Sequence, residues 1–178
     1  MVNNKPVYAF EEADSKKRML LGGKGAGLSE MTQLKLPVPV GFTITTEVCN
    51  KYYDNNKKLP KDVMPAVMKN IAKMEKKTGK KWNSIKNPLL VSVRSGAATS
   101  MPGMMDTILN LGLNEKTVEG LAEQTKNPRF SWDSYRRFIQ LFGKVVFGIN
   151  DEKFDHVLDE AKEKQGITDD SKLNVESL

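Results

Sequence analysis

The sequence predicts an α+β protein in which a mixed α/β lobe, residues 1–113, precedes an all-helical lobe, residues 114–178. Short apolar or alternating runs bounded by turn residues recur up to residue 113, and such runs indicate strands. Segments with apolar residues at helical spacing lie between these runs. After Asn114 only helical spacing remains, so the second lobe should contain no sheet.

Four strands are expected in the first lobe, at residues 7–10, 42–45, 89–95 and 107–113. The glycine-rich stretch 22–27 should lead into a helix with Leu28, Met31 and Leu34 on its apolar side. Two prolines in the following LPVPVG end that helix, because proline is not tolerated inside a helix.

Five further helical segments are expected. Thr46 should cap a short helix, and a longer one should run from 62 to 78, with Pro65 in its first turn and Gly79 after its end. Three helices follow in the second lobe. One stops at residues 127–128, one starts at Ser131, and one is capped by Asp151 and ends at 166. The tail 167–178 resembles the start of another helix, with Thr168 as its cap.

Composition excludes several classes of protein. Hydrophobic residues make up 39% and charged residues 28%, as in folded soluble domains. No apolar stretch approaches the ~20 residues of a membrane-spanning helix, and no secretion signal begins the sequence. Cys49 is the single cysteine, so an internal disulfide is excluded and a cytoplasmic location is expected. The net charge of +6 suits an anionic partner without deciding between a nucleotide and a nucleic acid.

The stretch GGKGAG, residues 22–27, is a candidate phosphate-binding loop. Glycine-rich turns before a helix offer backbone N–H groups to an anion, and Lys24 adds a full positive charge. Neither common nucleotide motif fits, because Gly25 follows Lys24 where a P-loop needs Ser or Thr, and Leu28 stands where a dinucleotide fingerprint needs Gly. A flexible turn with an exposed lysine is an equally good interpretation of this stretch alone.

A second candidate is the apolar run that ends in Arg94 and opens into SGAATSMPG. A guanidinium at the end of a buried strand needs a partner, and its planar donors suit phosphate oxygens. Small side chains after it let the backbone approach a ligand, and Asp106 adds a carboxylate that could reach a metal or a ribose. The alternative is a structural salt bridge from Arg94 to a core carboxylate. His156, between apolar neighbours on a helix, is interpreted as a surface or packing residue.

The runs LLGGKGAGLSEM, LPVPVGFTITTE, NPLLVSVRSGAATSMPGMMDTILNLGLN and SYRRFIQLFG occur in order along the chain. Together they resemble the N-terminal part of the pyruvate, phosphate dikinase family. That resemblance implies an incomplete ATP-grasp-like domain that binds ATP with Mg2+. The parent enzymes convert ATP, pyruvate and phosphate to AMP, phosphoenolpyruvate and diphosphate, through a phosphohistidine on a swivelling domain and a separate barrel that binds pyruvate.

By this resemblance Lys24 and Arg94 hold ATP phosphates, and Gly103 and Met104 close over the nucleotide. Asp106 and Thr107 lie at the same loop with roles that the resemblance leaves open. The signature of the phosphorylated histidine, the acidic metal ligands of a second lobe and the barrel are all missing from these 178 residues, so no catalytic residue and no metal ligand is assigned. The chain is therefore expected to be an inactive piece of a longer, homodimeric enzyme.

Two other interpretations remain open. One is a piece of a phosphoenolpyruvate synthase-type dikinase. The other is a basic, non-catalytic binding or scaffold module, although the basic residues are dispersed and not interleaved with aromatics as in nucleic-acid-binding modules. No nucleic-acid or membrane partner is expected.

Overall fold

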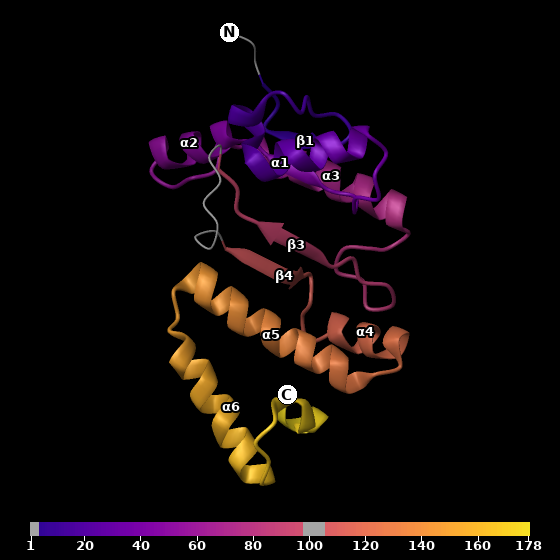
Figure 1. Cartoon of the computed structure of the whole chain (residues 1–178), viewed down its shortest axis with the longest axis vertical. Helices are drawn as coiled ribbons and strands as arrows, with labels where there is room; N and C mark the ends of the chain where they lie inside the picture. The colour runs from indigo at the N-terminus through magenta and orange to yellow at the C-terminus, as the bar shows by residue number, and fades with distance from the viewer. Residues whose placement is uncertain (1–3, 98–105) are drawn as a thin grey trace. The chain divides into compact units, whose positions relative to one another are not determined.

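The computed structural model describes residues 4–97 and 106–178, and Figure 1 shows the order of the elements along the chain. Two compact units can be distinguished. Unit 1 comprises Met1–Gly79 and Ser95–Met105, and unit 2 comprises Lys80–Arg94 and Asp106–Leu178. The subdivision at residue 113 stays a prediction about domain organisation. In the described residues, the segments 80–94 and 106–113, which precede that boundary, belong to the same unit as the helices that follow it.

Unit 1 contains a two-stranded antiparallel sheet and three helices. Strand β1 (Val7–Ala9) pairs with β2 (Phe42–Ile44), with Val7 opposite Ile44. The helices are α1 (Arg18–Gln33), α2 (Thr46–Asp54) and α3 (Val63–Thr78). Ala13, Leu21 and Ala26 form a buried cluster on which Tyr8 packs. Both strands lie where the sequence predicts them, within one residue at each end.

Helix α1 differs from the prediction at its start and in its buried face. It begins at Arg18 and runs through the glycine stretch, with one break at Gly22 (φ 71°, ψ 165°). Gly25, Ala26 and Ser29 are buried, whereas the expected core residues Met31 and Leu34 are 38% and 66% exposed. The small residues decide which side faces β2, because a side chain at Gly25 would come within 2.7 Å of the Thr43 hydroxyl.

Helices α2 and α3 follow the predicted order. The cap of α2 is Thr45 and not Thr46, whose hydroxyl instead donates a hydrogen bond to the Met19 carbonyl at 2.6 Å. Helix α3 matches the expected range, is capped at its end by Gly79 (φ 70°) as predicted, and buries Ile71 and Met74.

In unit 2, strand β3 (Val91–Arg94) pairs antiparallel with β4 (Thr107–Leu111), with an irregular register between Val91 and Val93. Figure 1 shows this hairpin. The prediction that β3 is buried is wrong, because Val91 is half-buried and the next three residues are exposed. Helix α5 packs against β4, and β3 pairs with β4 in a two-stranded sheet.

Unit 2 continues with three helices and two short 3₁₀ turns: α4 (Thr117–Thr125), α5 (Pro128–Phe147), α6 (Asp151–Gln165), η1 (Asp170–Lys172) and η2 (Val175–Ser177). Helix α5 starts three residues before the predicted Ser131, because Asn127 caps it and Pro128 occupies its first turn. Asn150, not Asp151, caps α6. The tail forms the 3₁₀ turns with Asp169 as the first cap, and not an α-helix starting at Thr168.

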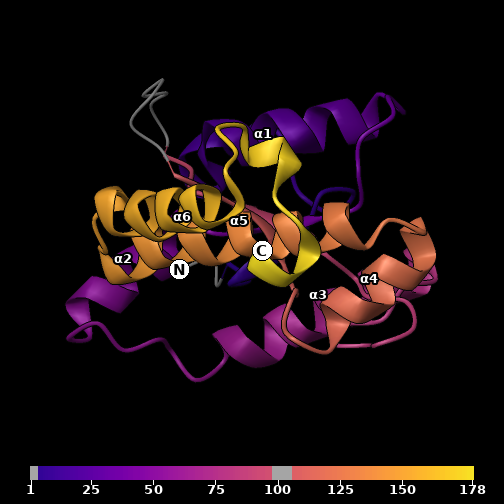
Figure 2. The same cartoon turned by 90° about the horizontal axis from the view of Figure 1, so that it is seen from below.

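The C-terminal segment returns to the beginning of α5, as Figures 1 and 2 show. The Arg129 guanidinium donates to the carbonyls of Leu173, at 3.0 Å, and Asp170, at 2.6 Å, and the Leu173 side chain is buried. No helix in the described residues is both long and apolar enough to cross a bilayer.

Candidate functional site

Gly22, Gly23 and Lys24, called here the glycine corner, lie at the break in α1. The Gly23 amide donates a hydrogen bond to the Ala97 carbonyl at 2.8 Å. The Lys24 ammonium, which is exposed, donates to the Ser95 carbonyl at 3.0 Å. The glycine corner therefore hydrogen-bonds the backbone of residues 95–97. These residues directly follow strand β3 in the chain and precede the rest of the predicted loop.

Gly22 makes this arrangement possible. Its φ of 71° is a left-handed conformation that residues with a Cβ rarely adopt. A Cβ at this position would lie 3.3 Å from the Ala97 oxygen, so the two backbone segments approach closely. The predicted glycine-rich turn thus exists as a single break inside a helix, and a second helical segment begins after it.

Arg18 lies at the same corner, although the sequence analysis did not identify it. A Cβ on Gly23 would be 3.2 Å from the Arg18 Nη2 atom and 3.6 Å from its Nε atom. The sequence predicts that this helix begins after the glycine-rich stretch 22–27, so Arg18 falls outside the predicted helix. A helix extended back through the glycines would have put Arg18 one turn before them and revealed the proximity.

The open end of the β3–β4 hairpin brings together three of the predicted residues. Arg94 is the last residue of β3 and lies opposite Thr107, the first residue of β4. Asp106 directly precedes Thr107 and is exposed. The pKa of the Lys144 ammonium is raised, chiefly by its bond to Asp151 and further by the charge of Asp106, so the Asp106 carboxylate acts on a cation of α5.

The Arg94 guanidinium is exposed, and no carboxylate lies within 4 Å of it in the part of the chain that the structure describes. The alternative of a structural salt bridge to a buried carboxylate is therefore not supported. Lys24 likewise forms no ion pair with a described carboxylate. Its hydrogen bond goes to Ser95, the residue that follows Arg94 in the chain.

Two predicted residues, Gly103 and Met104, lie outside the described residues. Within residues 4–97 and 106–178, no group of three or more His, Cys, Asp or Glu side chains is arranged to hold a metal ion. His156 is exposed on α6, with its Nε2 atom 3.2 Å from Glu160. This position agrees with its interpretation as a surface residue.

Comparison with known proteins adds the family. Residues 18–58 and 55–167 match the family described as pyruvate phosphate dikinase, AMP/ATP-binding domain. Pyruvate, phosphate dikinase of Entamoeba histolytica is 55% identical over 172 residues, which is 97% of this chain and 19% of that protein. The protein of the same name from Clostridium symbiosum is 50% identical over 172 residues, covering 97% of this chain and 20% of its own length.

A third relative, pyruvate, phosphate dikinase of Rhizobium meliloti, is 48% identical over 173 residues, 95% of this chain and 19% of that protein. The chain thus spans about a fifth of the length of these relatives. The family match extends through both compact units and includes Lys24, Arg94, Asp106 and Thr107. The chain belongs to the pyruvate phosphate dikinase AMP/ATP-binding domain family.

Proposed function

We propose that this chain supplies phosphate-binding groups to the ATP site of a pyruvate, phosphate dikinase. The observation that carries the proposal is that Lys24 and Arg94 are both exposed and that neither forms an ion pair with a described carboxylate. A cation without a counter-ion at the protein surface gains most from a polyanionic ligand. Membership of the AMP/ATP-binding domain family supports ATP as that ligand.

Lys24 and Arg94 have different roles in this proposal. The Lys24 ammonium has three donors, so it can keep its bond to the Ser95 carbonyl while it donates to a phosphate oxygen. Arg94 presents a planar fork that matches two phosphate oxygens at once. Holding ATP in this way would orient its phosphates for transfer, since phosphoryl transfer depends on positioning and charge stabilisation.

The remaining predicted residues have supporting roles. Gly103 and Met104 are proposed to close over the nucleotide through their backbone. Thr107, opposite Arg94, places a hydroxyl at the same strand end, and Asp106 adds a carboxylate. The described residues offer no cluster of metal ligands, so no magnesium site is proposed on them. Magnesium is expected to accompany ATP as its complex.

The reaction of the whole enzyme is also a proposal for this chain. ATP, pyruvate and phosphate would be converted to AMP, phosphoenolpyruvate and diphosphate. In this scheme the chain works with a phosphohistidine domain and a pyruvate-binding barrel, in a cytoplasmic homodimer. A role in a phosphoenolpyruvate synthase-type enzyme has less support, because the relatives described above are all named pyruvate, phosphate dikinase.

Titration of the chain with magnesium–ATP, followed by calorimetry or chemical shifts, tests the proposal. Arg94→Met should weaken binding by about ten- to a hundredfold, since a charge-assisted contact contributes roughly 1.5–3 kcal/mol. Lys153→Met, which removes an exposed cation from α6, is the matched control and should leave the affinity within about twofold. Equal affinities of the Arg94 and Lys153 variants would refute the phosphate role of Arg94.

A further inference from the structure

The five arginines of the chain fall into two groups. Arg129 donates to two backbone carbonyls, and Arg136 and Arg137 both pair with Asp133. The guanidinium groups of Arg18 and Arg94 have neither a hydrogen bond nor an ion pair within residues 4–97 and 106–178, and both are exposed. Three arginines therefore have structural partners. Arg18, like Arg94, is exposed and has no described partner, and Arg94 is the arginine proposed to bind phosphate.

The Arg18 guanidinium and the Ala97 carbonyl both lie close to Gly23, in the glycine corner. A Cβ built on Gly23 would lie 3.2 Å from the Arg18 Nη2 atom and 3.6 Å from the Ala97 carbonyl oxygen. Lys24, the next residue, donates to Ser95. The Arg18 guanidinium therefore lies near Gly23, the residue that hydrogen-bonds Ala97, and the Lys24 ammonium bonds Ser95, so both cations lie at the glycine corner of unit 1.

The absence of a side chain at Gly23 makes room for the guanidinium. With a φ that is not positive, Gly23 has no backbone need to be glycine, unlike Gly22. An added Cβ would press on the end of the Arg18 side chain at 3.2 Å, closer than ordinary van der Waals contact. Gly23 thus leaves room for a second cation, the Arg18 guanidinium, at the glycine corner.

We infer that Arg18 is a further phosphate-binding residue, which acts together with Lys24 on the polyphosphate of the nucleotide. This inference rests on the proposed function. Two like charges at one corner repel each other, and an anion that contacts both relieves that repulsion. The guanidinium can contact two oxygens of one phosphate, while the ammonium donates to another oxygen. Arg18 would therefore raise the affinity of the chain for the phosphates of the nucleotide and not for its base.

Charge variants test the role of Arg18. Arg18→Met keeps a long apolar side chain and removes the charge, so it should weaken magnesium–ATP binding by about tenfold. The same variant should bind inorganic tripolyphosphate more weakly by a similar factor. Such a result would show that Arg18 contacts the phosphates, since tripolyphosphate has no base or ribose. Lys16→Met removes an exposed cation two residues earlier and should change either affinity by less than about twofold.

A second pair of variants leaves every charge in place. Gly23→Ala should displace the Arg18 guanidinium and weaken binding several-fold, in proportion to the charge-assisted contact that is lost. Gly27→Ala, in the same helix with nothing within 4 Å of its Cβ position, should leave binding unchanged. Circular dichroism of both variants checks that the helix content is retained.

The outcomes separate this inference from the proposed function. If Lys24→Met weakens binding while Arg18→Met and Gly23→Ala behave like their controls, the role of Arg18 is overturned and the proposed function stands. If the unmodified chain fails to bind magnesium–ATP and tripolyphosphate at millimolar concentrations, the proposed function is contradicted, and this inference falls with it.

Discussion

Gly120 in α4 faces the backbone of the loop before β3. A Cβ at this position would lie 1.4 Å from the Ile85 carbonyl oxygen and 2.5 Å from its carbon, so the helix and the loop touch backbone to backbone. The neighbouring group is a main-chain carbonyl, which cannot change rotamer as a side chain could. Even one methyl group would have to displace the loop or the helix.

Gly120→Ala should therefore lower the free energy of unfolding of unit 2 by about 3 kcal/mol or more, at the upper end of overpacking costs. Gly27→Ala is the opposite case, because nothing lies within 4 Å of its Cβ position and its φ is not positive. That substitution should stabilise the chain by about 0.5–1 kcal/mol through helix propensity. Thermal unfolding followed by circular dichroism measures both, and equal midpoints for the two variants would contradict the close contact.

Gly22 differs from Gly120 and Gly27 because its backbone conformation, and not only the space around it, disfavours a side chain. Its φ of 71° is rarely adopted by L-residues, and its Cβ position is 3.3 Å from the Ala97 oxygen. Gly22→Ala should strain the left-handed backbone at this break, since alanine rarely adopts it, and weaken the hydrogen bond from the Gly23 amide to Ala97. Hydrogen exchange at the Gly23 amide should then accelerate by about tenfold or more, as expected for a lost hydrogen bond. Unchanged exchange would show that Ala97 is held in some other way.

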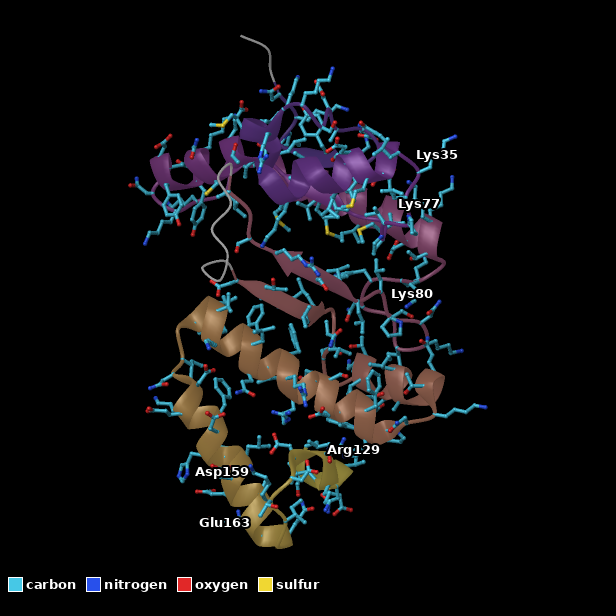
Figure 3. The ribbon with its side chains drawn as sticks, in the orientation of Figure 1. Lys35, Lys77, Lys80, Arg129, Asp159 and Glu163 are labelled. Carbon is cyan, nitrogen blue, oxygen red and sulfur yellow. The ribbon has the colours of Figure 1, made fainter. Side chains whose placement is uncertain are left out.

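At the scale of elements, helix α3 is tied to the N-terminal segment by two ion pairs, Lys73 with Glu12 and Lys77 with Glu11. Figure 3 marks Lys77 on α3. The hydrogen bond from Lys77 lowers the pKa of Glu11, and the bond from Lys73 lowers the pKa of Glu12, both from an ordinary value of 4.5. The ionised carboxylates therefore favour the folded state.

The sign of the pH effect follows from these lowered pKa values. The stabilisation is complete above about pH 4.5, where the unfolded chain is also ionised, and it is lost as the pH falls through the folded-state pKa values. Acidification below about pH 4.5 should thus lower the melting temperature of unit 1. The double variant Lys73→Met/Lys77→Met should show a weaker dependence on acid than the unmodified chain, and an identical dependence would assign the effect to other carboxylates.

The C-terminal 3₁₀ turns are held against α5 by one arginine. Arg129 donates to Leu173 and Asp170, and Figure 3 shows it beside this segment. Arg129→Met leaves two carbonyls without their donor, so residues 170–178 should exchange their amide hydrogens faster. Arg137→Met is the matched control because its side chain is 66% exposed. The prediction fails if exchange of the segment is the same in both variants.

At the scale of the whole molecule, the chain contains the residues proposed to bind phosphate but only one histidine, His156. It is exposed, with its Nε2 atom 3.2 Å from the Glu160 carboxylate, in a part of α6 that contains no predicted phosphate-binding residue. Phosphoryl transfer needs an acceptor positioned in line with the transferred phosphate. The 178 residues by themselves should therefore form no phosphoenolpyruvate from ATP, pyruvate and phosphate. Phosphorus NMR of the mixture measures this, and a phosphohistidine signal from His156 would contradict it.

The positions of the strands and of most helices could be predicted from the sequence, because their signals are local. Short alternating runs indicate β1 and β2, and Pro65 in the first turn and Gly79 after the end indicate the bounds of α3. Helix caps were predicted less well, with errors of one residue at α2 and α6, since neighbouring polar residues can both serve as caps. The phosphate candidates Lys24 and Arg94 came from motif and resemblance, and both are exposed in the structure.

The sequence by itself determined the family and the order of the elements, because these depend on residue types and short-range spacing. The phosphate roles of Lys24 and Arg94 also come from the sequence, and they stay predictions. The tertiary structure alone decided which face of α1 is buried, where that helix breaks, and that the Arg18 guanidinium lies close to Gly23. Each of these depends on how closely one backbone approaches another. Gly25 against Thr43 and Gly22 against Ala97 are contacts between residues far apart in the chain, which no local pattern encodes.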